Sequence, residues 1–200
     1  MAELLSIVLA SASPRRFDLL TSLGLHVDVH PSGLDEGDRL GYGPRELAAF
    51  HASAKADAGV TGRSAGVIVA ADTVVDLDGV ALGKPPTAAA AAEMLRALSG
   101  RDHLVHTAYV AIDAASNRRI GATLTTRVKF APLGDGDISA YVASGDPMDK
   151  AGAYGIQGRG AALVERIDGD FYTVMGFPLG DFVRRLPELG YTLPAMRVHA

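Results

Sequence analysis

Residues 4–16 of the chain read LLSIVLASASPRR, and this stretch decides the first unit of the fold. The apolar run that ends at Ala10 is typical of a buried strand, and the small residues after it predict a tight turn. Pro14 suits the first position of a helix, because its fixed φ matches the helix and its missing N–H would be unpaired there. Ser13 then stands at the N-cap, where we expect its side-chain oxygen to accept a backbone N–H of the first turn.

The same stretch has the features of a phosphate-binding site. Free amides and the positive end of the dipole at a helix start attract anions. Arg15 and Arg16 add guanidinium groups that suit phosphate oxygens, and Ser11 and Ser13 are small enough to let an anion approach closely. Taken alone, the stretch fits an ordinary strand-to-helix connection with solvated arginines equally well.

Composition limits the class of protein. The chain has 200 residues, of which 48% are hydrophobic, which suits one domain or two small lobes around a sizeable core. A net charge of −4 argues against a nucleic-acid partner, whereas a small anionic ligand needs only a few local cations. The absence of cysteine excludes disulfides, thiolate metal sites and cysteine nucleophiles. Without a signal-peptide pattern or an apolar run of about 20 residues, we expect a cytoplasmic protein with no membrane partner.

Helical and strand patterns are interspersed along the chain. The predicted strands are 5–10, 25–30, 67–71, a hairpin over 74–82 that turns at Asp78-Gly79, the pair 103–112 and 120–130, and a second hairpin of 162–167 with 171–175. The predicted helices are 14–23, 44–58, a segment capped by Thr87 and ending at 98, 135–144, and a last one after Pro178. This pattern indicates an α/β or α+β protein with one large mixed sheet, and we predict the α/β class, with a twisted sheet flanked by helices.

Asp72 follows the buried strand 67–71 directly, at the end of a strand where open α/β sheets bind ligands. A carboxylate there can hold a divalent metal or take a proton from water, although an Asp that only caps a turn is common. The loop 31–43 carries Asp35, Glu36 and Asp38, which would share a magnesium ion with Asp72 if the loop folds over it.

Two lysines are further candidates for phosphate contacts. Lys84 lies in the rigid turn Gly83–Pro85, and Lys55 lies in the alanine-rich helix 44–58. A lysine is a compact point charge that suits a phosphate oxygen. Taken alone, each is typical of a solvated surface lysine.

Residues 149–158 read DKAGAYGIQG and predict a tight loop that a ligand can approach closely. Gln157 offers a donor and an acceptor on one side chain, as the edge of a nucleobase requires, although a turn-rich connector would have a similar composition. The histidines lack metal-binding spacing, and we expect them to fill strands or lie on the surface. They are His26, His30, His51, His103, His106 and His199.

Five segments together resemble the Maf family. In family order, they are SASPRR (11–16), ADT (71–73), GKP (83–85), DKAGAYGIQG (149–158) and VMGFP (174–178). The resemblance runs from residue 5 to about residue 186 and implies one Maf-like domain over 1–200, with an inosine-triphosphatase-like architecture and an active-site cleft between two lobes. It also implies a nucleoside triphosphate pyrophosphatase, often a homodimer, that needs a divalent cation such as Mg²⁺ or Mn²⁺ and releases the monophosphate and pyrophosphate.

The resemblance assigns roles to individual residues. It makes Asp72 the catalytic proton acceptor and places Glu36 among the polar positions that line the family pocket. From these positions we expect Glu36 and Asp72 to hold the metal. Residues that match specificity positions are Arg15, Thr73 and Gln157, and those expected to bind phosphate or substrate are Ser11, Ser13, Arg16, Lys55 and Lys84. Phe177 departs from the leucine usual in the family, and we expect only local repacking there.

The loop 155–158, Gly-Ile-Gln-Gly, together with Ala-Asp-Thr at 71–73, is similar to the branch of the family that prefers dTTP and UTP. Two alternatives stay open. One is a nucleotide-binding regulator of septum formation in which hydrolysis is incidental, and the other is the same hydrolysis directed at modified or non-pyrimidine nucleotides.

Overall fold

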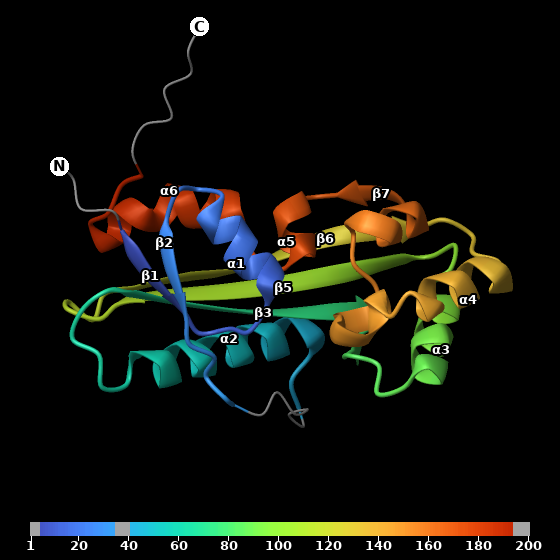
Figure 1. The fold of residues 1–200 in the computed structure, drawn as a ribbon, viewed down its shortest axis with the longest axis horizontal. Coiled ribbons are helices and arrows are strands. Elements are labelled where there is room, and N and C mark those ends of the chain that lie inside the picture. Colours follow the sequence, from blue (N-terminus) through green and yellow to red (C-terminus); the bar gives the residue numbers. More distant parts are fainter. Residues whose placement is uncertain (1–4, 35–40, 194–200) are drawn as a thin grey trace, which may run out of the picture.

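A computed structural model describes residues 5–34 and 41–193 of the chain, which form a seven-stranded mixed sheet with helices on both faces (Figure 1). The strand order is β2-β1-β3-β5-β6-β7, with β4 paired to β3. The strands are β1 (Ser6–Leu9), β2 (His26–Val29), β3 (Val67–Leu77), β4 (Val80–Leu82), β5 (Asp102–Asp113), β6 (Arg119–Phe130) and β7 (Val164–Asp168). β1 runs parallel to β2 and β3, whereas the other pairs are antiparallel, so the predicted mixed sheet is confirmed.

Helices pack on both faces of this sheet. The helices are α1 (Pro14–Thr21), α2 (Pro44–Val60), α3 (Ala88–Leu98), α4 (Asp135–Ala143), α5 (Phe171–Met175) and α6 (Leu179–Leu189), with short 3₁₀ turns η1 (Asp146–Asp149), η2 (Ala151–Ala153) and η3 (Gly158–Leu163). Figure 1 shows α2 on one face and α1 and α6 on the other, with α3 and α4 near the far end of the sheet. None of the helices within the described ranges has the length and apolar character needed to cross a bilayer.

Alternation along β3 separates the two faces of the sheet. Val67, Val69 and Ala71 belong to the core formed with α1 and α6, whereas Ile68 and Ala70 belong to the core formed with α2. Because successive side chains on a strand point to opposite faces, the next two residues, Asp72 and Thr73, are directed to the α2 face and the α1 face respectively.

The edge of β3 toward β1 has a gap in its pairing. β1 pairs with Val67–Val69 and then leaves the sheet into the turn 11–16, whereas β4 pairs with Val75–Leu77. Asp72 and Thr73 lie in the gap between these two neighbours. The prediction that Asp72 stands at the carboxyl end of its own strand is therefore wrong, because pairing with β5 carries β3 through residue 72. The strand that ends beside the site is β1.

Three other local predictions differ from the structure. α2 does not end at Gly59 but continues to Val60. Gly59 instead lets the helix approach the sheet, since a Cβ there would lie 2.9 Å from Ile68 Cγ2. Residues 171–175 form α5 rather than a strand, since Asp170 Oδ2 accepts the Thr173 N–H at 2.6 Å and Gly176 ends the helix with φ 108°. Ser13 occupies the N-cap of α1 without a capping hydrogen bond from its side chain.

Candidate active site

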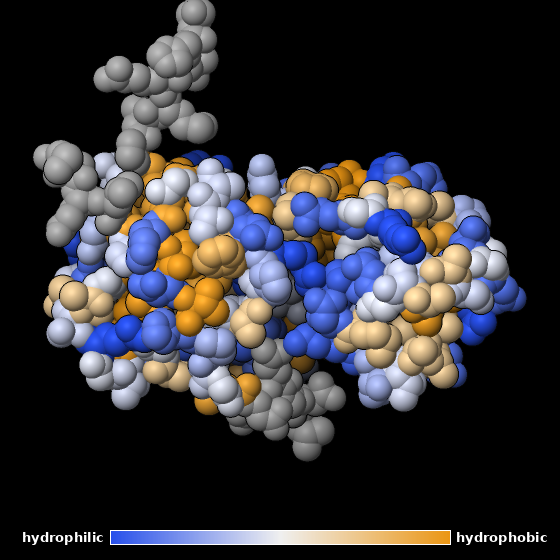
Figure 2. All heavy atoms as spheres, in the orientation of Figure 1, coloured by the Kyte–Doolittle hydropathy of each residue, from blue (hydrophilic) through white to orange (hydrophobic). Residues whose placement is uncertain are grey.

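A cavity of about 480 Å³ opens between the start of α1 and the segment 146–158. This size suits a small molecule. Figure 2 shows hydrophilic residues gathered around a hollow near the middle of the molecule. The walls come from the turn 11–16, the gap in the edge of β3, Lys84, the loop 146–158 and residues 174–176. The structure thus brings most of the sequence-predicted site residues to one pocket.

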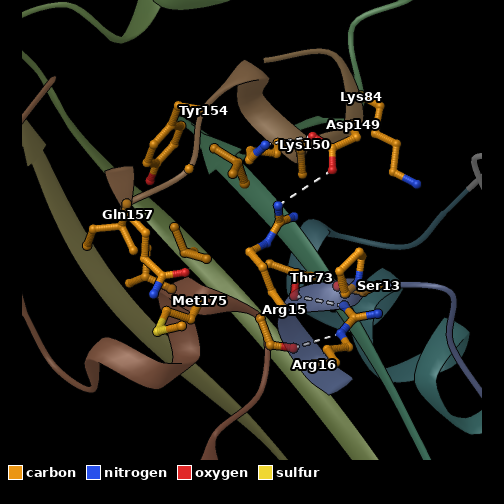
Figure 3. A pocket seen from close by; sticks show the side chains of 18 of the residues that line it. Ser13, Arg15, Arg16, Thr73, Lys84, Asp149, Lys150, Tyr154, Gln157 and Met175 are labelled. Carbon is orange, nitrogen blue, oxygen red and sulfur yellow. Dashed lines mark hydrogen bonds and ion pairs between the residues drawn. The ribbon is translucent and has the colours of Figure 1, made fainter. Parts of the chain in front are cut away.

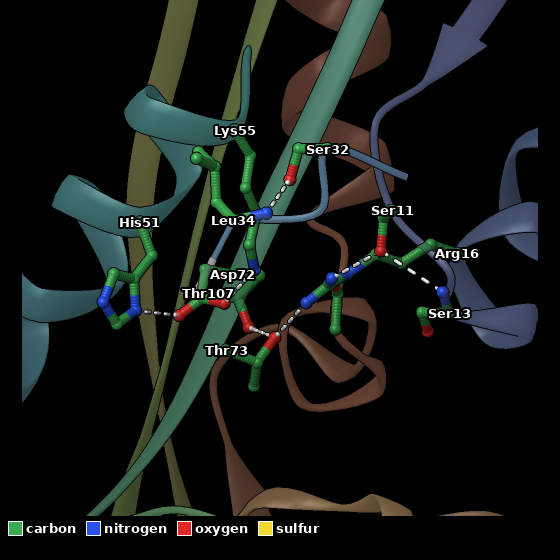
Figure 4. Close-up of polar contacts among 11 residues, drawn as sticks. Ser11, Ser13, Arg16, Ser32, Leu34, His51, Lys55, Asp72, Thr73 and Thr107 are labelled. Carbon is green, nitrogen blue, oxygen red and sulfur yellow. Dashed lines mark hydrogen bonds and ion pairs between the residues drawn. The ribbon is translucent and has the colours of Figure 1, made fainter. Parts of the chain in front are cut away.

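Asp72 is a buried carboxylate with a partner on each oxygen (Figure 4). Lys55 Nζ donates to Oδ1 at 2.7 Å, and His51 Nδ1 lies 3.3 Å from Oδ2. Burial by itself raises the pKa of this carboxyl, but the hydrogen bond with His51 and the charges of Lys55 and Arg16 outweigh it, so the pKa lies below its usual value. Asp72 is therefore ionised at neutral pH.

Both partners of Asp72 come from the buried face of α2. His51 and Lys55 are four residues apart, which places them one turn apart on the same side of the helix. The prediction that the histidines lie on the surface or fill strands is wrong for His51. Its spacing from the buried Ala48, Ala52 and Lys55 is the sequence signal that could have identified it. Lys55 is 4% exposed and contacts Asp72, so it is not a solvated surface lysine.

Arg16 is anchored by the protein on the other face of β3. Its Nη1 donates to Ser11 Oγ at 2.9 Å, its Nε to the Gly176 carbonyl at 2.8 Å, and its Nη2 to Thr73 Oγ1 at 3.2 Å. Thr73 is held in turn by a hydrogen bond with Thr107, because the hydroxyl oxygens of the two residues lie 3.0 Å apart. These bonds connect the turn 11–16, β3 and the end of α5, so Arg16 has a fixed place beside the pocket.

Arg15 instead extends across the pocket (Figure 3). Its Nη1 lies 3.6 Å from Asp149 Oδ2, and the other oxygen of Asp149 accepts Lys150 Nζ at 2.6 Å. The exposed side chain of Lys84 lies at the same end of the cavity, and Gln157, Tyr154 and Met175 lie at the opposite end. The pocket therefore has one charged end and one end that combines an amide with apolar groups.

The loop 146–158 and the turn η3 that follows it require glycines at close contacts. A Cβ on Gly160 would lie 1.8 Å from the Gly155 carbonyl oxygen, and one on Gly152, where φ is 66°, would lie 2.9 Å from the Val75 side chain. Tyr141 Oη accepts the Gly155 N–H at 3.1 Å and donates to Asp146 at 2.7 Å. The prediction of a tight loop is confirmed, and this packing holds Gln157 at the pocket.

Most of the predicted metal-binding cluster falls outside the described residues, as does His199. Glu36, with Asp35 and Asp38, belongs to residues 35–40, which the structure does not describe. Over the described ranges, no three His, Asp or Glu side chains come together as a metal site. Mg²⁺ in phosphate-binding sites takes only one or two carboxylates and keeps most of its waters. Asp72 lines the pocket and has a further lone pair on each oxygen, but Lys55 and His51 already contact these oxygens, so Asp72 would need a second carboxylate to hold the cation.

Three comparisons relate the chain to known proteins. A family model described as Maf-like protein matches residues 6–189. The dTTP/UTP pyrophosphatase of Geobacter metallireducens is 45% identical over 190 residues, covering 95% of this chain and 99% of that protein. That of Moorella thermoacetica is 47% identical over 173 residues, covering 86% and 89%.

Among solved structures, a HAM1 protein from Coxiella burnetii superposes with a TM-score of 0.51 at 20% identity, over 92% of this chain and 100% of that one. At this level of identity the likeness concerns the fold alone, and it confirms the predicted architecture. The matched regions cover 99% and 89% of these two relatives, and the family model covers most of this chain. The chain belongs to the Maf family.

Proposed function

We propose that the chain hydrolyses the pyrimidine nucleoside triphosphates dTTP and UTP to the monophosphate and pyrophosphate. The observation that carries the proposal is Asp72, a buried carboxylate held ionised at the edge of a pocket whose two ends differ in charge. The names of the relatives at 45% and 47% identity support the same substrates.

The pocket suggests how such a substrate would lie. We place the triphosphate at the end formed by Arg15, Lys84 and the start of α1, where cations and helix amides converge. The base would then reach Gln157, whose amide can pair with the edge of uracil or thymine. That the pocket is the substrate cleft between two lobes, as the family resemblance implies, stays a prediction.

Asp72 is the group that we assign to the attacking water. Its oxygens accept hydrogen bonds, so it can orient the water and take its proton as the bond to phosphorus forms. The contacts that keep it ionised also make it a weak base, and we infer that most of the rate comes from positioned positive charge around the phosphates. Lys55 contacts Asp72 in the structure, so we assign it to this carboxylate and not to a phosphate oxygen.

We also propose that Asp72 and Glu36 hold a divalent cation. When bound, the cation neutralises charge on the phosphates. Removing divalent metal with EDTA should abolish turnover, and adding Mg²⁺ or Mn²⁺ should restore it.

The decisive experiment is pyrophosphate release from a panel of natural and modified nucleoside triphosphates, with Mg²⁺ and Mn²⁺ and with Asp72→Asn as the control. Preferential hydrolysis of dTTP and UTP supports the proposal. Preferential hydrolysis of a modified or purine nucleotide would mean that this nucleotide, and not dTTP or UTP, is the substrate. Tight nucleotide binding without pyrophosphate release would favour the alternative of a regulator of septum formation. Homodimer formation and a cytoplasmic location stay predictions, of which light scattering tests the first.

A further inference from the structure

The pocket proposed to bind a triphosphate contains an acidic side chain at its charged end. Asp149 Oδ2 lies 3.6 Å from Arg15 Nη1, and the Asp149 side chain is 62% exposed. Burial is the largest single influence and raises the pKa of Asp149, but the hydrogen bond and charge of Lys150 and the charge of Arg15 together lower this pKa below its usual value, so Asp149 is negative at neutral pH. A fixed negative charge in an anion pocket opposes substrate binding unless it has another task.

The two neighbouring arginines of the turn 11–16 differ in how they are held. Arg16 is buried and donates to three protein oxygens. Arg15 is 30% exposed at its side chain and meets Asp149 at a distance longer than a hydrogen bond. Exposed ion pairs of this kind are weak, so an incoming phosphate can replace Asp149 as the partner of Arg15.

Asp149 itself is kept in place from the other side. Lys150 Nζ donates to Asp149 Oδ1 at 2.6 Å and also to Asp146, at 2.6 Å to the carbonyl and 3.0 Å to Oδ1. Asp149 therefore stays at the rim with a charged partner when Arg15 turns away. The carboxylate is ready to receive Arg15 again once the products leave.

We propose that Asp149 is a positioning residue that holds Arg15 across the empty pocket and gives it up to the phosphates of the substrate. This inference rests on the proposed function, because it requires a polyphosphate ligand. Because Asp149 competes with phosphate for Arg15, it weakens phosphate binding. It therefore raises both the KM for the triphosphate and the inhibition constant for pyrophosphate.

The test compares Asp149→Asn with wild type in pyrophosphate-release assays on UTP. The amide keeps an oxygen for Lys150 but removes the charge that opposes the phosphates. We expect KM, and the inhibition constant for added pyrophosphate, to fall about 2–5-fold, the range that exposed ion pairs provide. We expect kcat to change less than twofold.

Two controls separate this role from a general effect. Asp78→Asn breaks the exposed ion pair with Arg101, away from the pocket, with the same change in net charge, and should leave KM unchanged. In an Arg15→Gln background, Asp149→Asn should strengthen pyrophosphate binding by a smaller factor than in the wild type, because only the direct repulsion by Asp149 is then removed. Calorimetry measures this binding, so that loss of turnover does not matter.

The outcomes are distinguishable. A raised KM or a large loss of kcat in Asp149→Asn would overturn the inference, as would an equal effect of Asp149→Asn with and without Arg15. If wild-type protein releases no pyrophosphate from any nucleotide, the proposed function fails instead. Calorimetry with pyrophosphate on the wild type and Asp149→Asn then still decides whether Asp149 opposes phosphate binding.

Discussion

Two of the carboxylates that line this pocket, Asp72 and Asp149, face cations in opposite surroundings. Asp72 is 5% exposed, with Lys55 and His51 on its two oxygens, whereas the Asp149 side chain is 62% exposed and meets Arg15 loosely. A buried pair resists the loss of either partner, while an exposed pair contributes little and exchanges easily. The difference in burial therefore means that Asp72 keeps its partners, whereas Asp149 can exchange Arg15 for another partner.

The largest expected effect concerns activity. Asp72→Asn keeps the shape of the side chain but removes its capacity to accept a proton, so pyrophosphate release should fall at least about 10²–10⁴-fold. Circular dichroism and thermal unfolding should show a folded protein. Near-wild-type turnover in this variant would end the assignment of Asp72 as the reacting group.

The next effect concerns the buried pair. Lys55→Met leaves the Asp72 charge without its nearest cation, and we expect the free energy of unfolding in urea to drop by about 3–5 kcal/mol. The double variant Lys55→Met/Asp72→Asn removes the stranded charge and should recover much of this loss. A drop below about 1 kcal/mol in the single variant would mean that the pair behaves as an exposed one.

Stability should also depend on pH through Asp72. Its pKa in the folded protein lies below the unfolded value of 3.8, so its ionised form stabilises the fold fully above that value. This contribution is lost as pH falls from about 3.8 through the folded pKa. The difference in unfolding free energy between wild type and Asp72→Asn should therefore shift against wild type in acid, and a pH-independent difference would contradict the lowered pKa.

The smallest expected effect comes from the exposed pair. Asp149→Asn should change the free energy of unfolding by less than about 1 kcal/mol, because water screens the contact with Arg15. Urea denaturation of this variant beside Lys55→Met measures the contrast directly. Comparable losses in the two variants would remove the distinction between the fixed and the exchangeable carboxylate.

Much of the fold could be predicted because its signals are local. The turn at Asp78-Gly79, the cap of α3 by Thr87 and the pairing of β5 with β6 follow from short-range patterns, and all three are confirmed. The hairpin predicted over 162–175 failed, since residues 171–175 have β-forming side chains but receive a helix cap from Asp170. Capping and packing outweighed propensity there.

For the site, the motifs marked the right segments but not the contacts within them. Lys55 and His51 read as ordinary members of an alanine-rich helix. Their helical spacing places them on one face of α2, but only the packing against β3 shows that this face is buried. Asp72 read as the end of a strand, because the pairing partner β5 that extends β3 lies more than 30 residues away in the sequence.

By itself, the sequence determined the family, the mixed sheet and the segments that meet at the pocket, since these depend on residue types and spacing that remain visible along the chain. Only the tertiary structure decided which cationic side chain contacts which carboxylate. It placed Lys55 and His51 on Asp72, anchored Arg16 and left Arg15 to Asp149. The reason is physical: the strength and role of a charge depend on burial and on neighbours distant in sequence, which exist only once the chain has folded.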